Sequence, residues 1–277
     1  MWKSILLHAA PETVPGAANS AMYAASLAAT SKGELTGLAF AFKVPTPFGL
    51  RTGVDKSTIE KHQNALTESA HNCIAAAREL ARKAEVEFDE IIEERLAVAA
   101  PSIFASYARL HDVTVLSAGH DGSSENYGLI EAAIFESGRP VMLVPETGVN
   151  TFKNETVAIA WNDTAQSARA LREAMPLLAS SKNVHIIRVT DEERLAASIP
   201  SIDVAKYLAH HGIQATVSDT TSGEKGVYDA LIEKAVGVDA QILVMGAYGH
   251  SRLREQILGG ATRAVIESCP LAVLMAH

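Results

Sequence analysis

The sequence has few cysteines, few aromatic residues and no long apolar run, and each of these features argues against a class of protein. Only two of its 277 residues are cysteine, and aromatic residues make up 5%. Two cysteines are too few for the disulfide framework of a secreted domain, so Cys73 and Cys269 are interpreted as buried, reduced thiols. The low aromatic content argues against platforms that stack the bases of single-stranded nucleic acid. No apolar run approaches the ~20 residues of a membrane-spanning helix, so no membrane partner is expected.

An excess of positive charge is also lacking. The 24 lysines and arginines are outnumbered by 32 aspartates and glutamates, which gives a formal net charge of -8 at pH 7. Surfaces that bind DNA or RNA need positive charge against the phosphates, so no nucleic-acid partner is expected. The apolar run from Ser4 to Ala10 meets Pro11 and Glu12 at once and is too short for a signal peptide. The expected location is therefore the cytoplasm.

What the sequence does contain is an internal repeat. Two blocks recur in the same order: residues 112–119 (DVTVLSAG) with 239–246 (DAQILVMG), and residues 136–145 (ESGRPVMLVP) with 267–276 (ESCPLAVLMA). The polar stretch 146–155 carries no apolar pattern and is interpreted as a linker. Since self-similarity at a long offset indicates one fold used twice, we expect domains at 1–146 and 155–277.

Within each half, strand patterns alternate with helix patterns. In the second half the expected strands are 156–161, 184–189, 215–218, 241–246 and 272–275, and the expected helices are 165–178, 203–211, 227–236 and 261–269. Thr164 is the predicted N-cap of one helix, and Ser57 with Glu60 forms a capping-box pattern before a longer helix in the first half. The strands are short, continuous apolar runs, as is typical of a parallel sheet covered on both faces. The pattern predicts a doubly wound α/β fold, twice.

One strand-to-helix loop carries a distinctive set of glycines. Gly246 and Gly249 follow a predicted strand and permit close approach of the backbone. Gly259 and Gly260 lie at the start of the last predicted helix, whose first residues are Ala261 and Thr262. Backbone N–H groups at a helix start are placed to cradle an anion such as a phosphate. The alternative is that these glycines only shape a long loop.

The spacing Gly-x2-Gly-x9-Gly of Gly246, Gly249 and Gly259 resembles the nucleotide motif of the universal stress protein family. The resemblance covers the whole chain as two tandem domains and is most specific over residues 238–262. It implies a five-stranded, Rossmann-like parallel sheet in each half. It also implies ATP, alone or with Mg²⁺, between the first and fourth strand ends, with its phosphates on the glycine loop.

Single positions agree with the family motif to different degrees. Gly260 stands where the family has a hydroxyl residue, although its N–H remains, and Thr262 matches a threonine two positions on. Asn162, followed by Asp163, stands where ATP-binding members have an aspartate for the nucleoside; an amide both donates and accepts hydrogen bonds. Val189 matches a position that contacts adenine, with simple core packing as an equal alternative.

The first half departs further from the motif. Only five residues separate Gly122 from Gly128, and Ala10 stands at the aspartate position, so no ATP site is expected there. Because the family usually dimerises through its last strand, the strands at 141–144 and 272–275 are expected to pair within one chain. The result would be a pseudo-dimer; further oligomers and protein partners stay open.

No recognisable catalytic triad or metal pair accompanies the glycine loop. His250 follows Gly249 and is counted with the nucleotide-binding residues rather than as a catalyst. The leading hypothesis is a nucleotide-binding stress-response protein with an adenine nucleotide as its partner and slow ATP hydrolysis at most. One alternative is a nucleotide-independent interaction or scaffold protein, based on the missing hydroxyl at Gly260. Another is a true hydrolase or transferase that uses His250 or Asp163.

Overall fold

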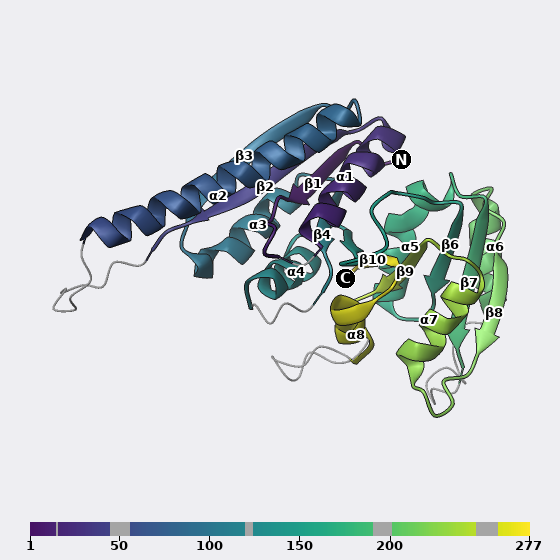
Figure 1. Ribbon diagram of the computed structural model, residues 1–277. Coiled ribbons are helices and arrows are strands. Elements are labelled where there is room, and N and C mark those ends of the chain that lie inside the picture. The colour runs from purple at the N-terminus through teal and green to yellow at the C-terminus, as the bar shows by residue number, and fades with distance from the viewer. Residues whose placement is uncertain (15, 45–55, 120–123, 191–200, 248–259) are drawn as a thin grey trace.

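The computed structural model describes residues 1–14, 16–44, 56–119, 124–190, 201–247 and 260–277. The first half consists of β1 (Ser4–His8), α1 (Ala17–Ser31), β2 (Glu34–Phe42), α2 (Lys56–Lys83), β3 (Phe88–Arg95), the short 3₁₀ turn η1 (Ala97–Ala99), α3 (Ala100–Ala108), β4 (Val113–Ser117), α4 (Ser124–Glu136) and β5 (Val141–Val144). The second half consists of β6 (Thr156–Ala160), α5 (Ala165–Leu178), β7 (Asn183–Val189), α6 (Ser201–His210), β8 (Thr216–Thr220), α7 (Val227–Gly237), β9 (Ile242–Gly246), α8 (Gly260–Ser268) and β10 (Ala272–Ala276). The strand–helix alternation predicted from the sequence is therefore present in both halves (Figure 1).

All ten described strands belong to one sheet, in the order β3-β2-β1-β4-β5-β10-β9-β6-β7-β8. Each half contributes five parallel strands, and the halves meet where β5 pairs with β10 in the antiparallel direction. In that pairing Met142 lies opposite Leu274. The expected pairing of the two last strands within one chain is confirmed, and the molecule is a pseudo-dimer.

Helices cover both faces of the sheet. One cluster of buried side chains lies beneath α1, α2, α5 and α6 and includes Ile74 and Leu171. A second cluster lies beneath α3, α4, α7 and α8 and includes Phe104 and Val265. Since each half places its first two helices on one face and its last two on the other, both halves are doubly wound.

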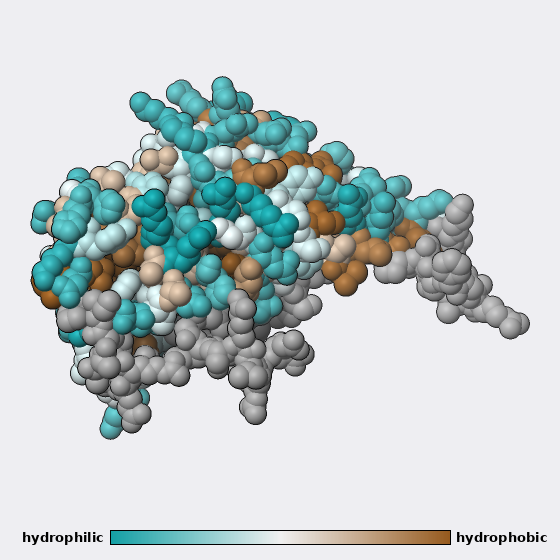
Figure 2. Space-filling view, turned by 180° about the vertical axis from the view of Figure 1, so that it is seen from behind, coloured by the Kyte–Doolittle hydropathy of each residue, from teal (hydrophilic) through white to brown (hydrophobic). Residues whose placement is uncertain are grey.

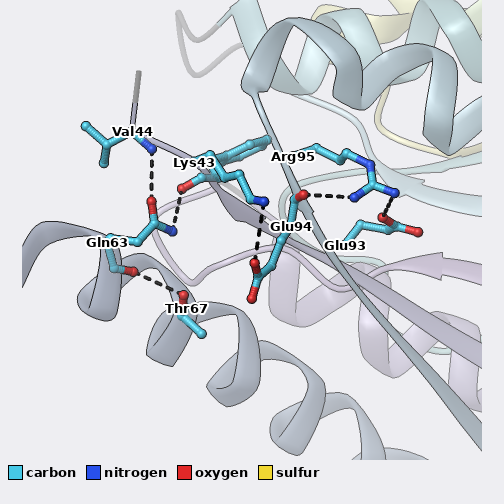
Figure 3. A network of polar contacts seen from close by, with 8 residues as sticks. Lys43, Val44, Gln63, Thr67, Glu93, Glu94 and Arg95 are labelled. Carbon is cyan, nitrogen blue, oxygen red and sulfur yellow. Dashed lines mark hydrogen bonds and ion pairs between the residues drawn. The ribbon is translucent and has the colours of Figure 1, made fainter. Parts of the chain in front are cut away.

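The two halves differ in the length of one limb. α2 has 28 residues, whereas α6, its counterpart, has 10, and together with β2 and β3 it extends from the body of the first half (Figure 1). The amide of Gln63 on α2 holds the end of this limb by donating to the carbonyl of Phe42 and accepting from the N–H of Val44. Lys43 forms an ion pair with Glu94 across β2 and β3, at 3.7 Å between Nζ and Oε2 (Figure 3).

Seen from behind, most of the described surface is hydrophilic, and the apolar residues form separate patches (Figure 2). None of the helices in the described part of the chain combines the length and the apolar character that a bilayer span requires.

Candidate functional site

The sheet has a topological switch point in the second half, at the strand β6. β6 lies between β9 and β7 in the sheet, with all three strands parallel. The helix after β6, α5, covers one face of the sheet, whereas the helix after β9, α8, covers the other. Where neighbouring strands send their chains to opposite faces, a crevice opens at the carboxyl edge, and ligands of α/β proteins commonly bind there.

A tight turn connects β6 to α5 at this crevice. The hydroxyl of Thr164 accepts from the N–H of Ser167 at 3.2 Å, and the hydroxyl of Ser167 accepts from the N–H of Thr164 at 3.1 Å. This reciprocal capping confirms Thr164 as the N-cap of α5. Asp163 adopts a left-handed conformation with φ of 54°, which an aspartate tolerates better than most residues. The exposed side chain of Asn162 joins the turn, because its Oδ1 accepts from the hydroxyl of Thr164 at 2.7 Å.

The end of β9 packs directly on the start of α5. A Cβ atom added to Gly246 would lie 2.6 Å from the carbonyl carbon of Gln166 and 2.6 Å from the nitrogen of Ser167. Both are backbone atoms and cannot swing away, so only glycine fits without displacing the helix. Gly246 therefore allows the backbone of Gln166 and Ser167 to come close to β9. This contact holds the end of β9 and the first turn of α5 together on one side of the crevice.

The remaining candidate residues lie on β7 and α8 or outside the described residues. Val189 ends β7 and is buried, with 6% of its surface exposed. Gly260 and Ala261 are the first two residues of α8, and the side chain of Thr262 is buried behind them. Gly249, His250 and Gly259 lie outside the described residues. The sheet thus brings Asn162, Val189 and Gly246 to the ends of adjacent strands.

Two polar side chains at this edge were missed by sequence reasoning. Trp161 follows β6 with 9% of its surface exposed, and its indole N–H has no hydrogen-bond partner among the described residues. Arg188, near the end of β7, forms an ion pair with Asp219 on β8 at 3.1 Å. For Trp161, the sequence offers only the fact that tryptophan is rare in this chain, which has two. No local pattern marks Arg188.

In the first half, the side chain of Glu146 lies against the residue that corresponds to Gly246. Gly119 follows β4 with φ of 130°, and a Cβ atom added there would overlap the carboxylate of Glu146. A Cβ atom added to Gly16, the N-cap of α1, would lie 2.7 Å from the Cα of Glu146. Asn19 on α1 donates to the carbonyl of Glu146 at 2.6 Å. Gly128, which aligned with the glycine loop, lies inside α4 rather than in a loop.

The two cysteines are not activated as nucleophiles. Burial raises the pKa of the Cys269 thiol to about 11, and burial also raises the pKa of Cys73, so both thiols stay protonated near neutral pH. Within the described ranges, no group of three or more histidine, cysteine, aspartate or glutamate side chains is arranged to hold a metal ion. What the crevice provides is a capped helix, exposed amide and carboxylate side chains, and the backbone N–H groups that begin α8.

Comparisons with known proteins agree with this architecture. The model of the Universal stress protein family matches residues 153–277. A universal stress protein from Archaeoglobus fulgidus DSM 4304 is similar in structure, with a TM-score of 0.70 and 17% identity over 98% of this chain and 97% of its own. A functionally unknown protein from Pseudomonas aeruginosa PAO1 has a TM-score of 0.54 and 16% identity over 99% of this chain and 92% of its own.

Other comparisons add less. A universal stress protein solved in complex with cAMP has a TM-score of 0.37 and 14% identity over 53% of this chain and 99% of its own. That likeness is too low to carry an argument about a ligand of this chain. The comparison with curated proteins returned no match. At these identities the solved structures show the fold alone.

Proposed function

We propose that this chain is a tandem member of the universal stress protein family, whose model matches its second half, and that this half binds one adenine nucleotide. The ligand is ATP, alone or with Mg²⁺, and the site is the crevice between the ends of β6 and β9. The observation that carries the proposal is the combination of this crevice with the glycine spacing that leads into α8 at Gly260. A cytoplasmic location is part of the same proposal.

The two ends of the ligand meet different chemistry. The backbone N–H groups that begin α8, from Gly260 to Thr262, offer donors and a positive helix end to the phosphates. The nucleoside lies toward β6 and β7, where Asn162 and Asp163 supply exposed polar groups and Val189 a buried apolar one. Gly249, His250 and Gly259 complete the proposed set of binding residues.

The first half takes no nucleotide in this proposal. Glu146 puts a carboxylate beside Gly119, at the position that corresponds to the end of β9 in the second half. A negative charge there repels the phosphates of a nucleotide, and the side chain also occupies space. The stoichiometry is therefore one nucleotide per chain.

Gly260→Asp tests the phosphate end of the site. An aspartate suits the first turn of a helix, so α8 is expected to form, but its charge opposes a bound phosphate. The matched control is Gly237→Asp at the end of α7, where an added Cβ meets no atom within 4 Å. α7 leads into the start of β9, so this control adds the same charge at the opposite edge of the sheet.

The measurement is a calorimetric titration of each protein with ATP and Mg²⁺. We expect saturable binding to the unchanged protein and to Gly237→Asp, and binding at least tenfold weaker to Gly260→Asp. Absence of binding to the unchanged protein would refute the proposal. Equal binding by all three proteins would place the nucleotide elsewhere.

A nucleotide-independent interaction protein is the second candidate function. Two observations favour it: Gly260 lacks the hydroxyl of the family motif, and Oδ1 of Asn162 is already bonded to Thr164. Acid extraction of the purified protein separates the two candidates, because release of stoichiometric adenine nucleotide contradicts a nucleotide-independent role. Slow ATP hydrolysis is tested by phosphate release from Asp163→Ala and His250→Ala; turnover unchanged in both variants excludes these two residues as catalysts.

A further inference from the structure

Trp161 has a buried polar group that the fold leaves unsatisfied. The residue follows β6 and is 9% exposed, and its indole N–H has no hydrogen-bond partner among the described residues. A buried indole N–H ordinarily finds an acceptor, because water is lost on burial and nothing replaces it. Because none of the described residues supplies an acceptor, this donor is available to a ligand bound at the ends of β6 and β7.

Trp161 directly follows β6, the strand that lies between β9 and β7. Its backbone N–H donates to the carbonyl of Ile187 at 2.9 Å, which continues the pairing of β6 with β7 by one residue. The side chain packs in the apolar cluster beneath α5, together with Ile159. The next residue is Asn162, whose turn begins α5. Trp161 thus lies on the nucleoside side of the proposed site, on the strand that borders the crevice.

Asp219, the acidic residue in register with Arg188 on the neighbouring strand, already has hydrogen-bond partners. The register that pairs Ala160 with Ile187 puts Trp161 beside Arg188, and Arg188 pairs with Asp219 on β8. Oδ2 of Asp219 is bonded to Arg188 at 3.1 Å, and Oδ1 accepts from the hydroxyl of Ser201 at 2.8 Å. With both oxygens engaged, this carboxylate holds the strand ends in place and does not serve the indole.

We propose that the indole N–H of Trp161 donates a hydrogen bond to an acceptor atom in the nucleoside part of the bound ligand. Ring nitrogens of adenine and hydroxyl oxygens of ribose are acceptors of the required kind, and the phosphates lie at α8 instead. The inference rests on the proposed function and adds a specificity-determining donor to it. A ligand without an acceptor at this place leaves the indole unsatisfied and binds less tightly.

The test is Trp161→Phe, which keeps an aromatic ring and removes the N–H. Dissociation constants for ATP and for adenosine are measured by calorimetry, and ligand-free stability is measured by urea denaturation. We expect both ligands to bind about 3- to 10-fold more weakly, by the same factor, since each loses one hydrogen bond. Removal of an unsatisfied donor raises the ligand-free urea midpoint and the cavity left by the smaller ring lowers it, so we expect a small net change. Trp2→Phe, at the other buried tryptophan, is the matched control and keeps the affinity of the unchanged protein.

The outcomes separate this inference from the proposed function. Binding by the unchanged protein with equal affinity in Trp161→Phe overturns the inference alone. Weakening for ATP but not for adenosine also overturns it, because the donor would then serve the phosphates. Absence of binding by the unchanged protein overturns both.

Fluorescence provides a second measurement that needs no change at position 161. In Trp2→Phe, Trp161 is the single remaining tryptophan. A hydrogen bond to its indole N–H shifts the emission to longer wavelength when adenosine saturates the protein. Emission that stays constant through saturation contradicts the contact, even if Trp161→Phe fails to fold.

Discussion

Gly246→Ala tests whether the crevice depends on the packing of β9 against α5. The added methyl group would lie 2.6 Å from two backbone atoms, those of Gln166 and Ser167, and 2.8 Å from the Cβ of Gln166. Unstrained carbon contacts lie at about 3.5–4.0 Å, so the first turn of α5 has to move by about 1 Å. Overpacking of this kind typically costs about 1–3 kcal/mol. The shift also moves the turn at Asn162, so nucleotide binding is expected to weaken together with stability.

Urea denaturation and calorimetric titration with ATP provide the two readouts. The control is Gly237→Ala, where the methyl group meets no atom within 4 Å at the end of α7. That change is expected to be neutral or to stabilise by up to about 1 kcal/mol, since alanine favours the helix. If Gly246→Ala unfolds at the same urea concentration as the unchanged protein and binds ATP equally well, the packing described for the crevice is wrong.

Three further predictions concern the body of the fold. Burial lowers the pKa of His8 to about 4, so the unfolded chain takes up a proton between pH 6.5 and pH 4 that the folded chain does not, and stability falls as the pH falls through this window. In urea denaturation at pH 7 and pH 5, His8→Phe should therefore lose about 2 kcal/mol less than the unchanged protein, and an equal loss would refute the burial of a neutral imidazole. Leu274→Ala, at the fully buried junction of β5 and β10, should cost about 2–5 kcal/mol, whereas the exposed Leu110→Ala should stay within about 0.5 kcal/mol; similar urea midpoints would contradict the joined sheet. Iodoacetamide at pH 8 should label the half-buried Cys73 before the buried Cys269, and peptide mass spectrometry that finds the reverse order would contradict their burial.

Much of the fold was predictable because local signals agreed with the tertiary structure. The helix expected at 165–178 has those bounds in the structure, since its apolar spacing and the cap at Thr164 indicate the same limits. The strand expected at 141–144 was equally well defined by an apolar run after a turn. The strand expected at 215–218 instead covers Thr216–Thr220, because pairing with β7 and not hydrophobicity keeps Asp219 and Thr220 in the edge strand. α2 begins at Lys56, one residue before the expected cap Ser57.

The crevice itself was less accessible to sequence reasoning. The glycine spacing points to the segment between β9 and α8, but the packing of Gly246 on Gln166 joins residues 80 positions apart and leaves no local pattern. The same holds for Glu146 beside Gly119. The sequence shows only that the first half departs from the glycine motif, whereas the structure shows a side chain against the corresponding glycine. That the indole of Trp161 lacks a partner among the described residues follows only from tertiary packing. Tertiary contacts of this kind decide what a loop binds, and a single sequence does not encode them as a pattern.

The most direct test of the account is the stoichiometry of nucleotide binding to the full chain. Calorimetric titration with ATP and Mg²⁺ should give one site per chain, lost in Gly260→Asp and kept in Gly237→Asp. No binding, or two equivalent sites per chain, would contradict the assignment of a single nucleotide site to the second half.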